Sequence, residues 1–356
     1  MKRREWILGL VVLAALAGLF AYEQHLHPFH WRVFASEFEK ASWTRIALGA
    51  SCIYIAFVFR GVRWAWLLRP NKRVPLFSLI GTQVMGFTAV ALIGRIADLV
   101  RPYLVSKRTG LSIGSQLAVY VVERLFDAGS MALLFCTAIL VSPSGSLPHQ
   151  DLFNKIGKGG LALTAAGVLF LVAVRLWGEW TASFLGGTVR PFSPDLAHAI
   201  VQKIRAFHRG LDTLRTPLDF VITLFLSLAM WCLITTAYWE GTGAFTGGSP
   251  ALSRCLALMA GGGVASIIQL PVIGWFTQIA ALQEMLKPLF DMSPETAMAC
   301  ATTLLLITFL GIAPVGLVWA HFENVNLRKV TEESEQVGGA LAKAETAEEG
   351  AASSIL

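Results

Sequence analysis

Charged residues are scarce in this sequence. Only 15% of its 356 residues are Asp, Glu, Lys or Arg and 55% are hydrophobic, whereas soluble domains average about 25% charged residues. This composition excludes an ordinary soluble domain and places the chain in the membrane class. Residues 6–22, 220–238 and 297–319 contain no charge at all. Since about 20 apolar helical residues cross a bilayer core, we predict an all-α, polytopic bundle of about seven to eight transmembrane spans.

Cysteine is also infrequent. The five cysteines lie in apolar stretches without paired spacing, which excludes a disulfide framework and a cysteine-based zinc site. His25, His27 and His30 lie close together near Glu23, but imidazoles in an interfacial loop are usually solvated rather than bound to a metal. We therefore predict no metal site.

Motifs of nucleotide chemistry are missing as well. The glycine-rich stretch 241–248 follows no predicted strand and precedes no lysine, so it does not match a phosphate-binding loop. The net charge of +6 lies in short loops beside apolar segments, which indicates membrane topology rather than nucleic-acid binding. We expect no cofactor, no nucleic-acid partner and no ATP-driven pumping by this chain alone.

The distribution of Lys and Arg orients the predicted spans. Residues 60–74 contain five basic residues and no acid, whereas 23–45 contain three of each. Because cytoplasmic loops are enriched in Lys and Arg, we predict a cytoplasmic loop at 60–74 and a cytoplasmic N-terminus. Segment 6–22 then runs outward as a retained anchor, with a cleaved signal peptide as the alternative, and 44–59 returns.

The rest of the chain divides into spans, one amphipathic stretch and a tail. Residues 177–216 repeat apolar side chains at helical spacing among basic ones, which predicts a helix on the inner membrane surface; a packed connecting helix is the alternative. Residues 322–356 are rich in Ala, Gly and Glu without an apolar period, so we predict a disordered tail after a transmembrane domain at 1–321. The further expected spans are 116–141, 159–176, 220–238, 251–270 and 297–319.

Two apolar segments are short and interrupted by Gly or Pro. Segment 74–94 has basic residues at both ends, which favours a re-entrant hairpin, with an ordinary single span as the alternative. Segment 271–290 is the corresponding segment of the second half. In transporters built from repeats, such a pair indicates a binding site near the membrane midplane. The predicted hinge or helix-breaking residues are Gly86, Gly94, Pro102, Pro271 and Gly274.

Charged residues inside the apolar stretches are the main functional signal. An ionisable side chain within a span costs about 2.5–3.5 kcal/mol, so it tends to be paired, turned inward and functional. In segment 116–141, Glu123 and Asp127 are four residues apart and share one helix face, while Arg124 is rotated about 100° away. That pair of carboxylates should attract a cation.

Three further charges lie shortly before this segment. Arg95, Asp98 and Arg101 are spaced by three, so neighbouring side chains can meet on a helix that Pro102 ends or kinks. Arg95 or Arg101 can pair with the later carboxylates and leave one guanidinium unmatched. A guanidinium suits a phosphate head group because it forms bidentate hydrogen bonds. The alternative is a buried ionic network that only holds the helices together.

The order of these charges resembles the pattern of the lysylphosphatidylglycerol synthase transmembrane, or flippase-like, family of bacterial membrane proteins. The resemblance covers roughly residues 5–325. It implies a multi-helix lipid handler of the bacterial inner membrane. Some members carry a soluble aminoacyl-transferase domain, which the remaining residues could not hold, so translocation is expected rather than synthesis. The matching residues are Gly94, Arg95, Asp98 (more often Glu in the family), Arg101, Pro102, Glu123, Arg124 and Asp127.

A second motif of that family, Pro-Gly-Gly-x-Gly-x-x-Glu, matches only in part. Pro271 and Gly274 are retained, whereas Gln278 lies near the position of the acid. This departure argues against a proton-coupled role for that position. Gln278 can still hydrogen-bond a lipid head group.

Together these features predict a lipid transporter. A charged cavity would take the head group of a phospholipid or polyprenyl-phosphate lipid while the tails stay in the bilayer. Two alternatives stay open, an intramembrane lipid-modifying enzyme with Glu123 or Asp127 as general base and a scaffold for a partner membrane enzyme. No nucleophile or donor-binding domain is evident, which favours a protein that is not an enzyme. The predicted binding residues are Arg95, Asp98, Arg101, Glu123, Arg124, Asp127 and Gln278.

Overall fold

The computed structural model describes residues 29–141, 216–265 and 273–336, together with scattered residues between 151 and 201. Within these residues every regular element is a helix, which confirms the all-α class. The predicted count of seven to eight spans is not reached there, since 6–22 and most of 159–176 are not described. The described helical segments that are long and apolar enough to cross a membrane are Trp43–Leu68, Leu76–Ile93, Pro217–Thr246 and Pro294–Phe322.

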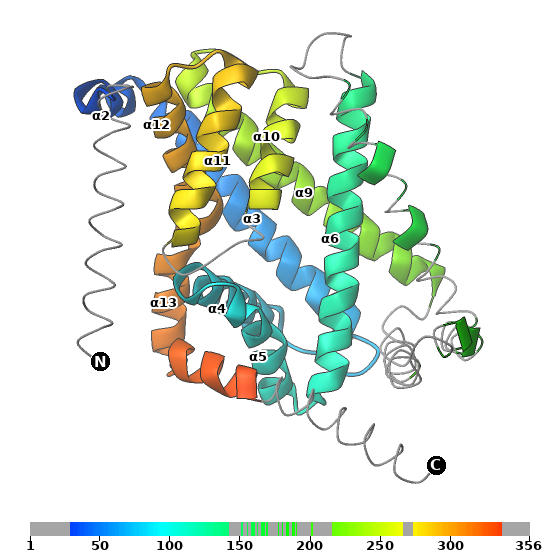
Figure 1. Ribbon diagram of the computed structural model, residues 1–356. Coiled ribbons are helices and arrows are strands. Elements are labelled where there is room, and N and C mark those ends of the chain that lie inside the picture. The colour runs from blue at the N-terminus through cyan, green and yellow to red at the C-terminus, as the bar shows by residue number, and fades with distance from the viewer. Residues whose placement is uncertain are drawn as a thin grey trace, which may run out of the picture.

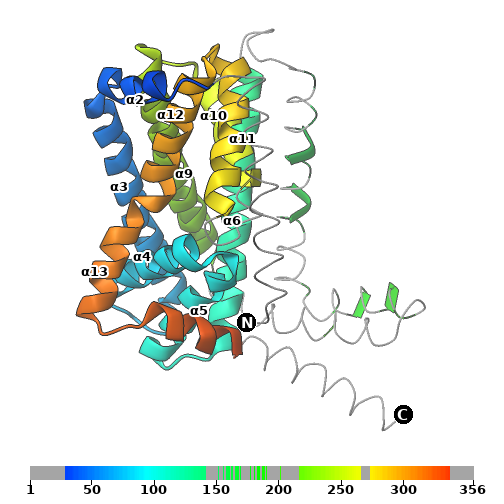
Figure 2. The ribbon, with the colours of Figure 1, turned by 60° about the vertical axis from the view of Figure 1, so that its left-hand side comes forward.

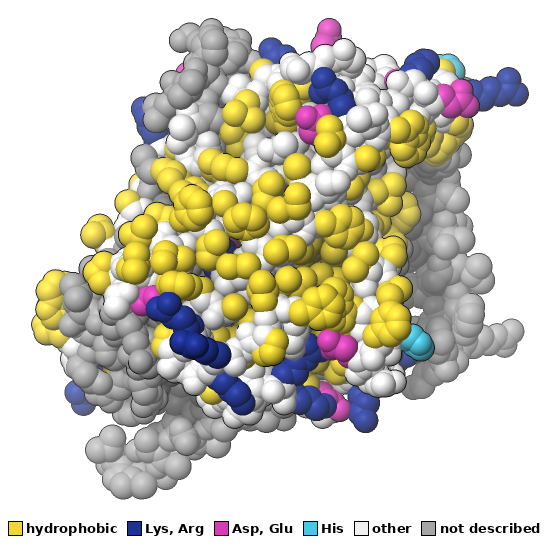
Figure 3. Space-filling model, turned by 180° about the vertical axis from the view of Figure 1, so that it is seen from behind, with side chains coloured by type: hydrophobic (Ala, Val, Ile, Leu, Met, Phe, Trp, Pro, Cys, Tyr) yellow, Lys and Arg dark blue, Asp and Glu magenta, His cyan; other side chains and the backbone are white. Residues whose placement is uncertain are grey.

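The outer surface also fits a bilayer. Figure 3 shows a broad hydrophobic band over one face, with Lys and Arg side chains gathered along its lower edge. Large apolar side chains such as Phe225, Val221 and Val58 are exposed. Helix α2 (Trp31–Lys40) lies across the end of the bundle opposite that basic edge (Figure 2). The structure and the composition together describe an integral membrane protein.

Helices α3 (Trp43–Leu68) and α9 (Pro217–Thr246) pack side by side as antiparallel neighbours (Figure 1). Ser42 N donates to Ala244 O at one end, and Arg69 Nη2 lies 3.5 Å from Asp219 Oδ1 at the other. Helix α3 continues through Leu68, although a loop is predicted from residue 60. That prediction is wrong because the first proline after the apolar run is Pro70, so nothing earlier stops the helix.

Segment 74–94 forms one continuous helix, α4 (Leu76–Ile93), and not a hairpin by itself. The chain turns at Gly94, passes through the 3-10 helix η1 (Arg95–Leu99) and returns as α5 (Val100–Thr109). The far ends of α4 and α5 meet, since Arg108 Nη1 donates to Ser78 O at 2.9 Å. A hairpin is therefore present, but its turn lies at Gly94, the last residue of the predicted segment, rather than in the middle of that segment.

Pro102 lies in the first turn of α5 instead of ending a helix. The first N–H groups of any helix have no intrahelical partner, so a proline there removes no hydrogen bond. The predicted helix through Arg95, Asp98 and Arg101 is consequently divided between η1 and α5.

Gly94→Ala should lower the free energy of unfolding by about 1–3 kcal/mol. Gly94 has φ 96° and ψ −171°, a backbone region that is essentially restricted to glycine. The matched control is Gly114→Ala, at a helical glycine whose added Cβ would meet open space, and we expect it to be neutral or slightly stabilising. Thermal unfolding of both variants in detergent measures the difference. Equal midpoints would contradict a strained turn.

Helices α10 (Leu252–Ala265) and α11 (Ile273–Phe290) form a second hairpin-like pair. Their outer ends meet because Arg254 Nη1 donates to Leu289 O at 3.0 Å. The predicted crossing by residues 251–270 is not confirmed, since α10 has 14 residues and 266–270 lie outside the described part. The pair approaches α4 from the face opposite α5 (Figure 1). Trp275 Nε1 donates to Ala91 O at 2.9 Å, so the two broken segments of the sequence meet in space.

The last span consists of α12 (Pro294–Leu305), the π-helical turn η3 (Leu306–Leu310) and α13 (Ile312–Phe322). Residues 327–336 form one more helix. Its Leu327 and Val330 are buried against Leu104 of α5. Disorder from residue 322 onward is therefore a wrong prediction for 327–336, whose two apolar residues are three apart and share a face. Residues 337–356 lie outside the described part.

Candidate functional site

Helix α6 (Ile113–Val141) brings two carboxylates into the core of the bundle. Glu123 is fully buried and Asp127 is 4% exposed. Arg63 of α3 bridges them, since its Nη2 donates to Glu123 Oε1 at 2.7 Å and its Nη1 to Asp127 Oδ1 at 2.6 Å. Glu123 and Asp127 share one helix face, as predicted. The cation that they attract is a group of the protein itself, the guanidinium of Arg63.

Further donors hold the same carboxylates. Trp64 Nε1 donates to Glu123 Oε2 at 2.9 Å, and Arg101 Nη1 lies 3.3 Å from the same oxygen. Trp231 Nε1 of α9 donates to Asp127 Oδ1 at 3.4 Å. Each carboxylate is thus bonded from at least two helices besides its own, which pins both side chains in place.

Arg60 and Arg63 are site residues that the sequence prediction places in a cytoplasmic loop. Both lie in α3 and are 8% and 1% exposed. Arg60 Nη1 lies 3.7 Å from Glu123 Oε1 and 3.6 Å from Asp127 Oδ2. Arg60 and Arg63 are three residues apart, so on a helix they share a face, as Glu123 and Asp127 do. This spacing would have indicated both arginines if the helix had been predicted to continue to Leu68.

Positive charge exceeds negative charge in this group, which we call the charged cluster. Four guanidinium groups face the two buried carboxylates, and Asp98 at the edge lies 3.7 Å from Arg101 Nη2. With all seven side chains ionised, four positive and three negative charges leave one positive charge over. Several guanidinium nitrogens, including Nε and Nη2 of both Arg101 and Arg124, have no hydrogen-bond partner among the described residues. The cluster consists of Arg60, Arg63, Asp98, Arg101, Glu123, Arg124 and Asp127.

A chamber of about 180 Å³ opens beside the charged cluster. Asp98, Arg124 and Gln278 contribute polar groups to its lining from η1, α6 and α11. The side chain of Arg124 is 34% exposed, and Gln278 Oε1 is buried without a hydrogen-bond partner among the described residues. Apolar residues of its wall include Phe87, Val90, Trp231, Ile234 and Phe309.

The predicted binding residues therefore lie mostly in one place. Arg101, Glu123, Arg124 and Asp127 are in direct ionic contact, with Asp98 at their edge. Gln278 lines the chamber that Asp98 and Arg124 also line. The backbone of Arg95 begins η1, while its side chain lies outside the described part.

The predicted hinge residues have separate positions. Gly86 lies inside the unbroken α4, where an added Cβ would overlap the side chain of Arg101, so this glycine allows a close approach. Gly94 forms the turn of the first hairpin. Gly274 is buried in the first turn of α11, and Thr277 Oγ1 donates to its carbonyl at 3.0 Å. Pro271 lies outside the described residues.

The π-helical turn η3 contributes Thr308 and Phe309 to the chamber wall. Pro314, which follows in α13, has no N–H to donate to the preceding turn, so the regular hydrogen-bond ladder is interrupted here. Single π-turns within helices occur frequently at functional sites. The last span thus departs from regular helical geometry beside the chamber.

Comparison with known proteins agrees with this architecture. A search of curated proteins and a search of solved structures found no match. A family model described as the lysylphosphatidylglycerol synthase TM region matches residues 6–316. That range includes every residue of the charged cluster and both hairpins. The chain therefore belongs to the lysylphosphatidylglycerol synthase transmembrane family.

Proposed function

We propose that this protein binds the phosphate head group of a membrane lipid in the chamber and moves that lipid between the leaflets of the bacterial inner membrane. The observation that carries the proposal is the excess of guanidinium groups over carboxylates beside a chamber with apolar walls. Guanidinium N–H groups without partners in a low-dielectric site favour an anion with several acceptor oxygens. A phosphate-containing lipid supplies both an anion for the guanidinium groups and an apolar part that can contact the chamber walls.

Arg124 is the residue that we expect to contact the phosphate first. It lines the chamber and is 34% exposed, whereas Arg63 and Arg101 are buried and already paired with carboxylates. Asp98 and Gln278 face the same space from two other elements. They can orient the rest of the head group by hydrogen bonding.

The two hairpins support a transport role. They enter from opposite faces, and α4 and α11 are joined by the Trp275–Ala91 hydrogen bond. Helical hairpins whose inner ends meet beside a polar cavity resemble the discontinuous helices of transporters that expose one site alternately to either side. A relative movement of the hairpins would open the chamber first to one leaflet and then to the other. The outer end of the first hairpin, which carries Lys72 and Lys107, would face the cytoplasm.

The geometry disfavours the enzyme alternative. A general base needs a free carboxylate within reach of substrate, but both oxygens of Glu123 accept hydrogen bonds from Arg63 and Trp64. Asp127 Oδ1 is likewise occupied by Arg63, and its Oδ2, although without a hydrogen-bond partner among the described residues, lies between Arg60 Nη1 at 3.6 Å and Arg124 Nη2 at 3.7 Å. We therefore assign these acids to positioning the arginines.

A leaflet-resolved assay in proteoliposomes tests the proposal. A phospholipid with a chain-attached fluorophore is compared with a glycosyl diacylglycerol whose head group is polar but uncharged, and a membrane-impermeant quencher reports the outer leaflet. We expect the protein to accelerate redistribution of the phospholipid only, with its mass unchanged. A changed lipid mass would support an enzyme. Neither effect, together with a stoichiometric partner after purification, would support a scaffold.

A further inference from the structure

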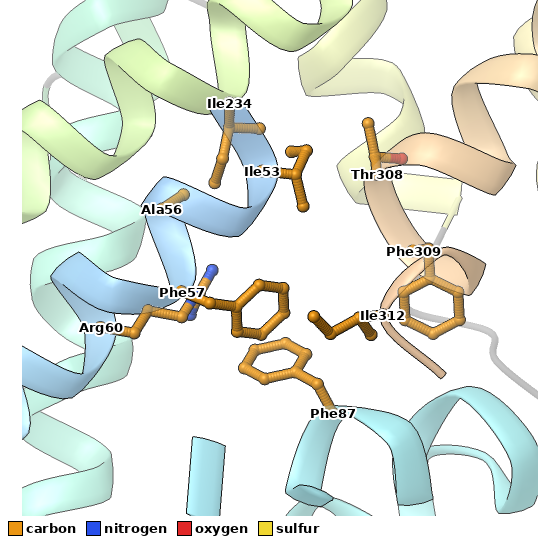
Figure 4. Close-up of a pocket in the computed structure, with 9 residues that line it drawn as sticks. All are labelled: Ile53, Ala56, Phe57, Arg60, Phe87, Ile234, Thr308, Phe309 and Ile312. Atoms are coloured by element: carbon orange, nitrogen blue, oxygen red, sulfur yellow. The ribbon is translucent and has the colours of Figure 1, made fainter. Parts of the chain in front are cut away.

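A second cavity, of about 70 Å³, adjoins the chamber on the side of α3. We call it the apolar lobe. Three aromatic rings and Ile312 surround this space, and Arg60 lies at one edge beside Phe57 (Figure 4). Its apolar lining comes from α3, α4, α9, η3 and α13 and includes Ile53, Phe57, Phe87, Ile234, Phe309 and Ile312.

The apolar lobe and the chamber share part of their walls. Phe87, Ile234 and Phe309 line both cavities, so a movement of these side chains would join the two spaces. Arg60 connects the lobe to the charged cluster, because its guanidinium carbon lies 4.6 Å from the centre of the Phe87 ring while its Nη1 faces Glu123 and Asp127. A ligand would therefore have its charged part beside Arg124 and its apolar part beyond Phe87.

The lining determines what can fill the lobe. A cavity lined by aliphatic and aromatic side chains stays dry and binds apolar molecules, because water there would lack hydrogen-bond partners. Leaving such a space empty forfeits the dispersion contacts of its walls. Arg60 and Thr308 are the polar side chains of its lining, and Thr308 Oγ1 already donates to Leu304 O.

We propose that the apolar lobe binds a segment of a hydrocarbon chain of the same lipid whose phosphate enters the chamber. This inference rests on the proposed function. It changes the expectation that the tails stay in the bilayer, since one chain then travels inside the protein with the head group. An isoprenoid chain and an acyl chain share the required chemistry, so the experiment includes one probe of each.

Photolabelling tests the apolar lobe directly. The full-length protein in proteoliposomes is irradiated with a diacyl phospholipid or a polyprenyl phosphate, each carrying a diazirine on its chain near the head group. We expect labelling at Ile53 or Ile312 that saturates and is competed by the unlabelled lipid. Val58, which lies on the exposed side of α3, should be labelled without saturation by bulk lipid.

Filling the lobe should remove the specific labelling. Ala56→Leu adds a larger side chain to the lining, and we expect about tenfold less saturable labelling because overpacking a cavity excludes its ligand. Val58→Leu, at the exposed face, is the matched control and should change nothing. Ile312→Phe provides a second filling variant in case Ala56→Leu does not fold.

The possible results separate this inference from the proposed function. Saturable labelling by either probe supports the lobe and identifies its chain. Labelling at Ile53 and Ile312 that behaves as at Val58 overturns the lobe, and leaves the proposed function standing if lipid transfer is observed. Saturable labelling without any transfer by the wild-type protein supports the lobe and overturns transport.

Discussion

Arg63→Ala should lower the free energy of unfolding by about 3–5 kcal/mol. Arg63 is 1% exposed and bridges Glu123 and Asp127, so its removal leaves two buried carboxylates without their shortest ionic contacts. The desolvation cost of those charges would then no longer be offset by attraction to the bridging guanidinium. Denaturant or thermal unfolding in detergent measures the loss.

Two comparisons make this result specific. Arg63→Lys should fall between wild type and Arg63→Ala, because an ammonium is a point charge that cannot span both carboxylates as a guanidinium fork does. Arg328→Ala removes an exposed ion pair with Glu332 and should cost about 0–1 kcal/mol. A loss for Arg63→Ala no larger than that for Arg328→Ala would show that the charged cluster does not hold the bundle together.

Arg124→Gln should reduce lipid transfer by about 10- to 150-fold, the equivalent of one lost hydrogen bond to a charged group. Its stability should stay close to that of the wild type, because Arg124 Nη2 lies as far as 3.8 Å from Glu123 Oε1 and 3.7 Å from Asp127 Oδ2. The proteoliposome assay measures transfer, and unfolding in detergent measures stability. Normal transfer at a normal folded yield would exclude Arg124 as the phosphate ligand.

Arg328→Gln is the matched control for Arg124→Gln, since it removes the same charge from an exposed position outside both cavities. Arg101 would be a less informative choice. It is fully buried, pairs with Glu123 and passes over Gly86, so its removal would disturb packing as well as charge. The exposure of a side chain to the chamber therefore decides which arginine reports on function.

Local patterns in the sequence predict that Glu123 and Asp127 share a helix face and that two short apolar segments are interrupted by Gly or Pro. The first follows from helical periodicity alone, and the second from Gly and Pro in short apolar runs. The position of Arg63 could not be predicted in the same way, because basic residues after an apolar run are also typical of a cytoplasmic loop. What places Arg63 inside is its contact with acids sixty or more residues away, which no local pattern contains.

Local sequence patterns also could not predict the course of α10 through the bundle. Its glycines allow close helix contact in any topology, and an apolar run of this length is compatible with a full crossing or with half of a hairpin. The contact between Arg254 and Leu289 shows that α10 is paired with α11, which no local pattern contains. Pro102 shows the same ambiguity on a smaller scale, since proline suits the first turn of a helix as well as the residue that ends one.

The hydrogen bond from Trp275 Nε1 to Ala91 O joins the beginning of α11 to the end of α4. A movement of one hairpin would therefore act on the other at this contact. In the transport cycle that we propose, such coupling would oppose an arrangement in which the chamber is open to both leaflets at once.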